Sequence, residues 1–242
     1  KKNVNTHKLK IAMIGDSNTQ GSNGAYRLYL QDKLTQNGID FDFVGIRQTH
    51  TPSNTPLGLI ADPDHTSFGG WRIHEVHDRL KSSWDINPDT LGQPDIALVM
   101  LGTNDMIADV GVHGPPPFAD SMAFENAQKN YENFLNDLFE YYPDLTVFVG
   151  NLLTSGKSLA TDNKEQEKAL KEIQKRIELF NHNFINMLGQ NENINLHEGN
   201  LQIVDMFSIF QPSEMPSRFH PAEEDYERVA KMWFDAMSYE SK

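Results

Sequence analysis

The sequence predicts a single α/β domain, in which a mostly parallel sheet of five strands lies between two layers of helices. Five short apolar runs alternate with segments of helical periodicity along the 242 residues, and no internal repeat or linker divides them. This alternation is typical of parallel sheets covered by helices on both faces. We therefore expect one three-layer domain over residues 1–242, with residues 1–8 as a flexible N-terminal extension and the flavodoxin-like strand order 2-1-3-4-5.

Each predicted strand is a run of four to six mostly apolar residues, which is the length of a strand rather than of a helix. The third run, residues 96–101, is continuously apolar, as is usual for a parallel strand buried on both faces. The third run is bounded by Pro94 and Gly102, which mark its ends. In chain order, the predicted strands cover residues 9–14, 41–44, 96–101, 145–149 and 201–204.

A segment with helical periodicity follows each predicted strand. In chain order, the predicted helices cover residues 25–34, 73–80, a stretch after the prolines at 115–117, 164–188 and 222–237. The first ends before Asn37 and Gly38, which are a helix stop signal. The fourth has one apolar stripe at helical spacing: Leu170, Ile173, Ile177, Phe180, Phe184 and Leu188. A long polar loop reaches to about Gly70, and we expect it to carry specificity, with residues 114–118 at the rim of the cleft.

Composition excludes several classes of function. The formal net charge of −13, without a run of Lys or Arg, argues against nucleic-acid binding. The chain has no cysteine, so thiol catalysis and Cys-ligated zinc are excluded, and no apolar run of about 18 residues predicts a membrane span. His74 and His77 have an i, i+3 spacing, which we interpret as surface rather than a metal site. We expect no metal and no cofactor.

The start at Lys1 indicates a trimmed chain or a mature one, and favours a secreted or periplasmic protein.

Three polar loops follow predicted strands or precede the last helix, and parallel topology brings them to one edge of the sheet. They are residues 15–17 (Gly-Asp-Ser), 102–105 (Gly-Thr-Asn-Asp) and 217–220 (Ser-Arg-Phe-His). A serine becomes a nucleophile when a base removes its proton, and acyl transfer also needs N–H donors for the developing oxyanion. Ser17, His220 and Asn104 supply these groups.

Each loop also has a purely structural interpretation. Asp16 or Ser17 could merely cap the following helix, and residues 15–24 could cradle a phosphate or flavin, although the Walker and dinucleotide glycine spacings are missing. Asn104 could hold a turn, and a lone histidine such as His220 is usually structural.

In combination, these motifs resemble the SGNH or GDSL hydrolase superfamily, in particular its carbohydrate acetylesterase-like branch. Gly-Asp-Ser matches the first block of that superfamily, and the resemblance implies that Ser17 is the nucleophile. Residues 67–73 (Ser-Phe-Gly-Gly-Trp-Arg-Ile) resemble the second block, which assigns an oxyanion N–H to Gly70, with Gly69 as the second choice. Gly-Thr-Asn-Asp matches the third block, which gives Asn104 a side-chain role in the oxyanion hole.

The last block departs from the superfamily pattern. The usual Asp-x-x-His-Pro is here Ser217-Arg-Phe-His220-Pro, so the base is kept and the acid is replaced. That acid normally orients the imidazole and stabilises the imidazolium. Three explanations stand: a Ser-His dyad oriented by a backbone carbonyl, by Ser217 or by a nearby acid such as Glu214; a weakened or inactive relative; or an Asp replaced in this particular chain.

The resemblance implies a serine esterase that removes small acyl groups, with O-acetyl esters of carbohydrate as the expected substrate. Trp71 is a candidate sugar-stacking residue, although a core role is also open, and Arg72 is suited to an acidic sugar or to solvent. Within the same chemistry, the alternatives are a lysophospholipase, a thioesterase or a general short-chain esterase. Outside it, they are a non-catalytic carbohydrate-binding relative and, more distantly, a flavodoxin-like phosphate or flavin binder. The expected partner is a small-molecule or glycan ester.

Overall fold

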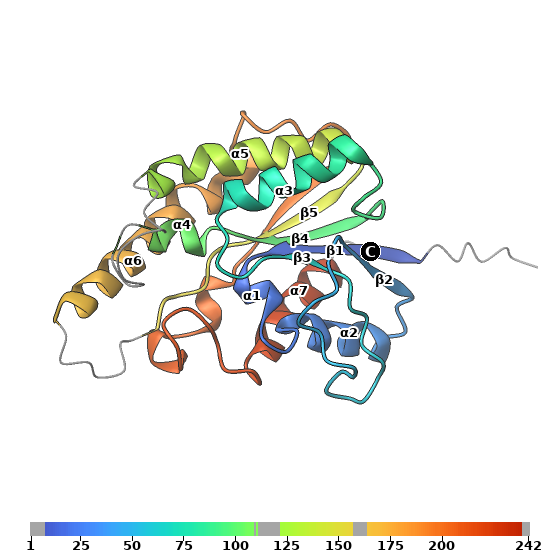
Figure 1. Ribbon diagram of the computed structural model, residues 1–242, viewed down its shortest axis with the longest axis horizontal. Coiled ribbons are helices and arrows are strands. Elements are labelled where there is room, and N and C mark those ends of the chain that lie inside the picture. Colours follow the sequence, from blue (N-terminus) through green and yellow to red (C-terminus); the bar gives the residue numbers. More distant parts are fainter. Residues whose placement is uncertain (1–7, 109, 111–121, 157–163, 239–242) are drawn as a thin grey trace, which may run out of the picture.

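The computed structural model describes residues 8–108, 110, 122–156 and 164–238 (Figure 1). Its strands are β1 (Leu9–Gly15), β2 (Phe41–Val44), β3 (Thr66–Ser67), β4 (Ile96–Met100), β5 (Thr146–Gly150) and β6 (Asn200–Val204). Its α-helices are α1 (Ser17–Gln20), α2 (Tyr26–Gln36), α3 (Ile73–Ile86), α4 (Thr103–Ile107), α5 (Ala123–Tyr141), α6 (Lys164–Asn183) and α7 (Tyr226–Ser238). Three short 3-10 helices are η1 (Ile185–Gln190), η2 (Phe207–Ile209) and η3 (Pro212–Glu214).

The sheet is parallel, and its main strands run in the order β2-β1-β4-β5-β6. This confirms the predicted fold class and the predicted order, with β4, β5 and β6 as the third to fifth strands of the sequence analysis. The small strand β3 was not predicted. It pairs with β1 at Ile14 and Gly15, beyond the point where β2 ends, and so extends the sheet at its carboxyl edge.

The side chains of each strand alternate between two separate cores, as the pleat of a strand requires. Along β1, Ile11 and Met13 join the core under α2 and α7, whereas Ala12 and Ile14 join the core under α3, α5 and α6. Figure 1 shows α2 and α7 on one side of the sheet and α3 and α5 on the other. Burial on both faces explains why the strands are continuous apolar runs in the sequence.

The helices differ from their predicted bounds where local signals were weak. α3 runs six residues further than the predicted end at 80, to Ile86. The predicted helix 164–188 ends as an α-helix at Asn183 and continues as η1, because the tighter coil still buries Ile185 and Leu188. The last helix begins at Tyr226 rather than at 222, after successive turns.

Some predictions fall outside the described residues. These are the N-terminal extension up to residue 7 and nearly all of the proline-containing rim at 114–118. Among the described segments, no helix combines the length and the apolar character needed to cross a bilayer.

Candidate active site

The turn after β1 presents Ser17 at the carboxyl edge of the sheet. A side chain at Gly15 is excluded, because its Cβ would lie 2.1 Å from Oγ1 of Thr19 and 2.9 Å from the carbonyl oxygen of Met100. Asp16 caps the short helix α1 by accepting a 2.9 Å hydrogen bond from the N–H of Asn18. Ser17 is the first residue of α1, so its own N–H is one of the four that no carbonyl within a helix accepts.

The side chains of Ser17 and His220 meet although 203 positions separate them in the sequence. Oγ of Ser17 lies 2.8 Å from Nε2 of His220, and both residues are half-buried, so the pair is packed in place and still reaches solvent. The loop that carries His220 is tied to the segment after β5, because the N–H of Gly156 donates to the carbonyl of Arg218 at 2.8 Å. A hydroxyl at this distance from an imidazole nitrogen is positioned to transfer its proton.

Ser217 contacts His220 on the Nδ1 side of the ring, opposite Ser17. Its Oγ accepts the backbone N–H of His220 at 2.9 Å, can donate to the carbonyl of His220 at 3.1 Å, and lies 3.4 Å from Nδ1. With the hydroxyl hydrogen on the carbonyl, a lone pair faces Nδ1. This network favours the tautomer with the hydrogen on Nδ1, which leaves the lone pair of Nε2 facing Ser17.

Glu214, the nearby acid considered in the sequence analysis, has other partners. Its carboxylate accepts the N–H of Gln211 at 2.7 Å and pairs with Arg228 at 3.0 Å. Both contacts hold the pKa of Glu214 below its usual value, the Gln211 hydrogen bond most strongly. These contacts belong to η3 and α7, whereas Ser217 lies beside Nδ1 of His220.

The loop after β3 brings the two glycines of the second block to the same edge. The N–H of Gly69 donates to Oε1 of Gln20 at 2.9 Å, so Gly69 serves to fasten this loop to α1. Gly70 is exposed and has a φ of +80°, a left-handed conformation that favours glycine. Of the two glycines, Gly70 therefore remains the better candidate for an oxyanion N–H.

Asn104 lies in the first turn of α4, directly after β4. Its Nδ2 donates to the carbonyl of Trp71 at 2.8 Å. A primary amide has two N–H groups, so this bond fixes the plane of the amide and leaves the second N–H for another acceptor. The bond also ties the α4 turn to the loop that carries Gly70.

Two buried carboxyl groups, Asp16 and Asp105, accept hydrogen bonds from backbone N–H groups of the loops at the site. Asp105 accepts the N–H of Ile73 at 3.0 Å, which joins the α4 turn to the start of α3. Asp16 accepts the N–H of Asn18, a bond within the turn that carries Ser17. Burial raises the pKa of Asp16 to about 6 and that of Asp105 to about 8. At neutral pH, Asp105 is therefore mostly protonated.

With this geometry established, comparison with known proteins identifies the family. The sequence profile of the GDSL-like lipase/acylhydrolase family matches residues 13–228, a span from β1 into α7. The chain belongs to this GDSL-like family. It is therefore an ester hydrolase. A search of curated proteins gives no match.

Solved structures of esterases and lipases share the fold of this GDSL-like hydrolase. A carbohydrate esterase of family 3 from Talaromyces cellulolyticus has 21% identity and a TM-score of 0.68, with 96% of this chain and 97% of that chain covered. An acetyl esterase mutant with acetate ion has 19% identity and a TM-score of 0.65, with the same coverage of both chains. The lipase Lip_vut3 from a goat rumen metagenome has 16% identity and a TM-score of 0.63, covering 95% and 97%.

Trp71 of the hydrolase is half-buried beside the candidate site. Its ring stacks on Phe68 with centroids 4.3 Å apart and an interplanar angle of 17°, and it packs against the α3–α5 core. One face of the indole is therefore covered. Arg72 does not extend into solvent as a free charge, since its guanidinium binds both carboxylate oxygens of Glu75, at 3.1 and 3.2 Å.

The prediction that His74 and His77 lie on the surface is wrong for His77. Its side chain is buried between α3 and α5, where Nε2 lies 2.8 Å from a carboxylate oxygen of Asp137. The residue faces the neighbouring helix because it continues the apolar stripe of Ile73, Val76 and Leu80. Within the described part of the chain, no group of three or more His, Asp or Glu side chains could hold a metal ion.

Asp105 and Gln20 also hold the loops of the site together, a role that the sequence does not indicate. Asp105 stands inside a quoted motif, but its hydrogen bond to Ile73 depends on tertiary contact. Gln20 carries no sequence signal, because its bond to Gly69 spans 49 positions.

Proposed function

We propose that this hydrolase is a serine esterase in which Ser17 is the nucleophile and His220 the general base. The observation that carries the proposal is the 2.8 Å separation of Ser17 Oγ and His220 Nε2 at a solvent-accessible edge of the sheet. A hydroxyl bonded to an imidazole, with N–H donors close by, is the arrangement that acyl transfer requires.

The reaction has two steps. His220 takes the proton of Ser17 as Oγ forms a bond to the ester carbonyl carbon, and the resulting oxyanion is bound by the N–H groups of Ser17, Gly70 and Asn104. The tetrahedral intermediate expels the alcohol, which receives the proton from His220. Water then attacks the acyl-enzyme by the same route, and the acid leaves while Ser17 regains its hydrogen.

The proposed substrate is a small acyl ester, an O-acetyl group on carbohydrate. Two of the similar structures are described as a carbohydrate esterase and an acetyl esterase with acetate ion. Trp71 would offer the face that is not stacked on Phe68 to a sugar ring. The second candidate is an esterase for longer acyl chains, and the similarity to the lipase Lip_vut3 favours it.

Fluorophosphonate labelling tests the nucleophile directly. We expect the probe to form a bond to Ser17, releasing fluoride, and to leave Ser17→Ala unlabelled. The matched control is Ser22→Ala, an exposed serine close in sequence, which should label like the wild type. Absence of label in folded wild-type protein would exclude the Ser-His mechanism and leave a non-catalytic relative.

A chain-length series tests the substrate class. p-Nitrophenyl acetate, butyrate, octanoate and palmitate would be compared by kcat/KM, together with acetate release from acetylated xylo-oligosaccharides. We expect acetate to be the best acyl group and release to be lost in Ser17→Ala. A preference for octanoate or palmitate would support the long-chain alternative.

A further inference from the structure

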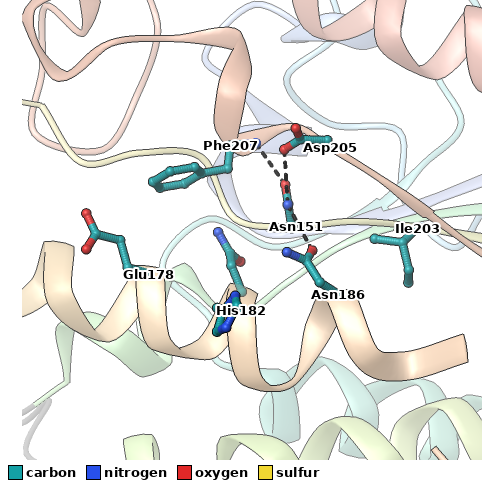
Figure 2. A pocket seen from close by; sticks show the side chains of 8 residues that line it. Asn151, Glu178, His182, Asn186, Ile203, Asp205 and Phe207 are labelled. Carbon is teal, nitrogen blue, oxygen red and sulfur yellow. Dashed lines mark hydrogen bonds between the residues drawn. The ribbon is translucent and has the colours of Figure 1, made fainter. Parts of the chain in front are cut away.

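A pocket with a volume of about 500 Å³ lies at the carboxyl edge of the sheet beyond β5 and β6. Its walls come from α6, η1, β6 and η2, and neither Ser17 nor His220 lines it. Figure 2 shows the ring of Phe207 on one side of this pocket and the side chains of Glu178 and His182 on the other. We call it the α6 pocket. Its size lies within the range of about 300–1,000 Å³ that is usual for small-molecule sites.

Hydrogen bonds within the protein hold Asn151 in place at the base of the α6 pocket. Asn151 is 3% exposed, and its Oδ1 accepts the N–H groups of Met206 and Phe207 at 2.7 and 2.8 Å. Its Nδ2 donates to the side chains of Asn186 at 3.1 Å and Asp205 at 3.2 Å, as Figure 2 shows. One amide therefore joins the ends of β5 and β6 to η1. Such preorganisation lowers the entropy cost of binding.

A second buried amide holds α6 against this floor. Asn181 accepts the N–H of Leu152 at 2.8 Å and donates to the carbonyl of the same residue at 2.9 Å, as a neighbouring strand would. Glu178 and His182 lie on either side of Asn181 in α6, so their positions relative to Asn151 are fixed by this pair of bonds.

The polar groups around the pocket suit a neutral ligand rich in hydroxyl groups. Glu178 and Asp205 contribute carboxylates, which only accept hydrogen bonds, and among the described residues no Lys or Arg lines the pocket, so an anion would meet repulsion. Both carboxylates already have neighbours that donate to them, Gln174 and Ser208 respectively, which lessens the attraction for a cation. The ring of Phe207 adds an apolar face. A sugar ring combines hydroxyl donors with an apolar C–H face.

The α6 pocket and Ser17 share one edge of the sheet. Asn151 directly follows β5, Asp205 directly follows β6, and Ser17 lies two positions after the end of β1. β5 and β6 are two and three strands away from β1, so at about 4.8 Å per strand the lateral separation is roughly 10–14 Å. An oligosaccharide spans such a distance, whereas a single sugar does not.

We propose that the α6 pocket binds an uncharged sugar residue of the same carbohydrate chain whose acyl group reacts at Ser17. This inference rests on the proposed function for the identity of the substrate, but the pocket itself is defined by its own residues. It makes the enzyme selective for oligomeric over monomeric esters, because only an oligomer reaches both places.

The test is a binding measurement that needs no turnover. Ser17→Ala protein would be titrated with xylotetraose, cellotetraose and mannotetraose by calorimetry, with tetragalacturonate as the anionic comparator. We expect at least one neutral tetrasaccharide to bind, and tetragalacturonate to bind more weakly. Failure of all three neutral sugars to bind, or equally tight binding of tetragalacturonate, would overturn the proposal.

Two variants in the Ser17→Ala background locate the binding. Phe207→Leu keeps an apolar side chain and removes the flat ring, which we expect to weaken binding about tenfold. Glu178→Gln keeps the shape of an exposed side chain and removes its charge, which we expect to weaken binding roughly threefold to tenfold. Glu167→Gln, on the same helix three turns earlier, is the control and should bind like its parent.

The outcomes separate this inference from the proposed function. Unchanged affinity in both Phe207→Leu and Glu178→Gln would exclude the α6 pocket even if the protein is an active esterase. If Phe207→Leu lowers the melting temperature of the protein, the affinity of Glu178→Gln alone decides whether the α6 pocket binds the sugar, because the Glu178 side chain is exposed. Because these proteins lack the Ser17 hydroxyl, the result does not depend on fluorophosphonate labelling or on acetate release.

Discussion

Replacing Ser217 with Asp adds a carboxylate beside the imidazole that acts as the proposed base. Oγ of Ser217 lies 3.4 Å from Nδ1 of His220, and an Asp side chain is one bond longer, so its carboxylate can reach hydrogen-bond distance. His220 becomes positively charged as it takes the proton of Ser17. A negative charge next to Nδ1 therefore stabilises the transition state more than the resting enzyme. We expect Ser217→Asp to raise kcat.

The size of this gain follows from the environment of the pair. Unit charges 4 Å apart interact by about 1 kcal/mol in bulk water and about 4 kcal/mol at the effective dielectric constant near a protein surface. Ser217 is exposed and His220 half-buried, so we expect about 1–3 kcal/mol. A carboxylate cannot donate to the carbonyl of His220 as the serine hydroxyl does, but this bond is lost from the resting enzyme and the transition state alike, so its loss does not reduce the gain in kcat. The expected increase in kcat is therefore about fivefold to 150-fold.

The assay compares initial rates on p-nitrophenyl acetate for the wild type, Ser217→Asp and Ser217→Asn. The Asn variant has the shape of Asp without its charge, so it should not reproduce the gain. The increase in Ser217→Asp should shrink at high salt, because an exposed charge pair is screened. The pKa of the base in the kcat/KM profile should also rise in this variant.

Two results would refute this reasoning. An unchanged or lower rate in well-folded Ser217→Asp would mean that His220 is already oriented and stabilised without a charge at this position. An equal gain in Ser217→Asn would mean that shape, rather than charge, limits the wild type.

Two further predictions concern Asn104 and Asp105, in the turn of α4. Asn104→Ala should lower kcat by about 10²- to 10³-fold with little change in melting temperature, because it removes one oxyanion donor; near-normal turnover would exclude that role. Asp105 has a pKa of about 8 in the folded chain against an ordinary value of 3.8, so between these pH values the folded state holds a proton that the unfolded state has lost. The contribution of Asp105 to the free energy of unfolding should therefore fall as pH rises from about 4 to about 8, by up to about 1.4 kcal/mol per pH unit, and urea denaturation of the wild type and Asp105→Asn across this range measures it. Asp105→Asn should flatten this slope, and an equal slope in the variant would contradict the assignment.

The strands and the loops of the candidate site could be predicted because their signals are local or topological. Burial on both faces makes the inner strands β4 and β5 mostly apolar runs, and parallel pairing brings the residues after the strands to one edge. Ser17 and His220 could thus be placed together across 203 positions.

Other features could not be predicted, because tertiary contacts decide them. Thr66 and Ser67 form β3 although they are polar, since β2 ends early and leaves the edge of β1 open. The apolar spacing continues through the change from α6 to η1, so periodicity does not mark it. The floor of the α6 pocket depends on Asn151, whose partners lie 35 to 56 positions away.

The pairing of β3 with β1 couples the turn that carries Ser17 to the loop that carries Gly70. Residues Ile14 and Gly15 lead into the serine turn, and their partners Thr66 and Ser67 lead into the loop of Gly70. Local opening of either loop must break the ladder that holds the other, so the two should lose amide protection together in hydrogen exchange. Such coupling keeps the separation of the Ser17 hydroxyl and the Gly70 N–H nearly constant during thermal motion.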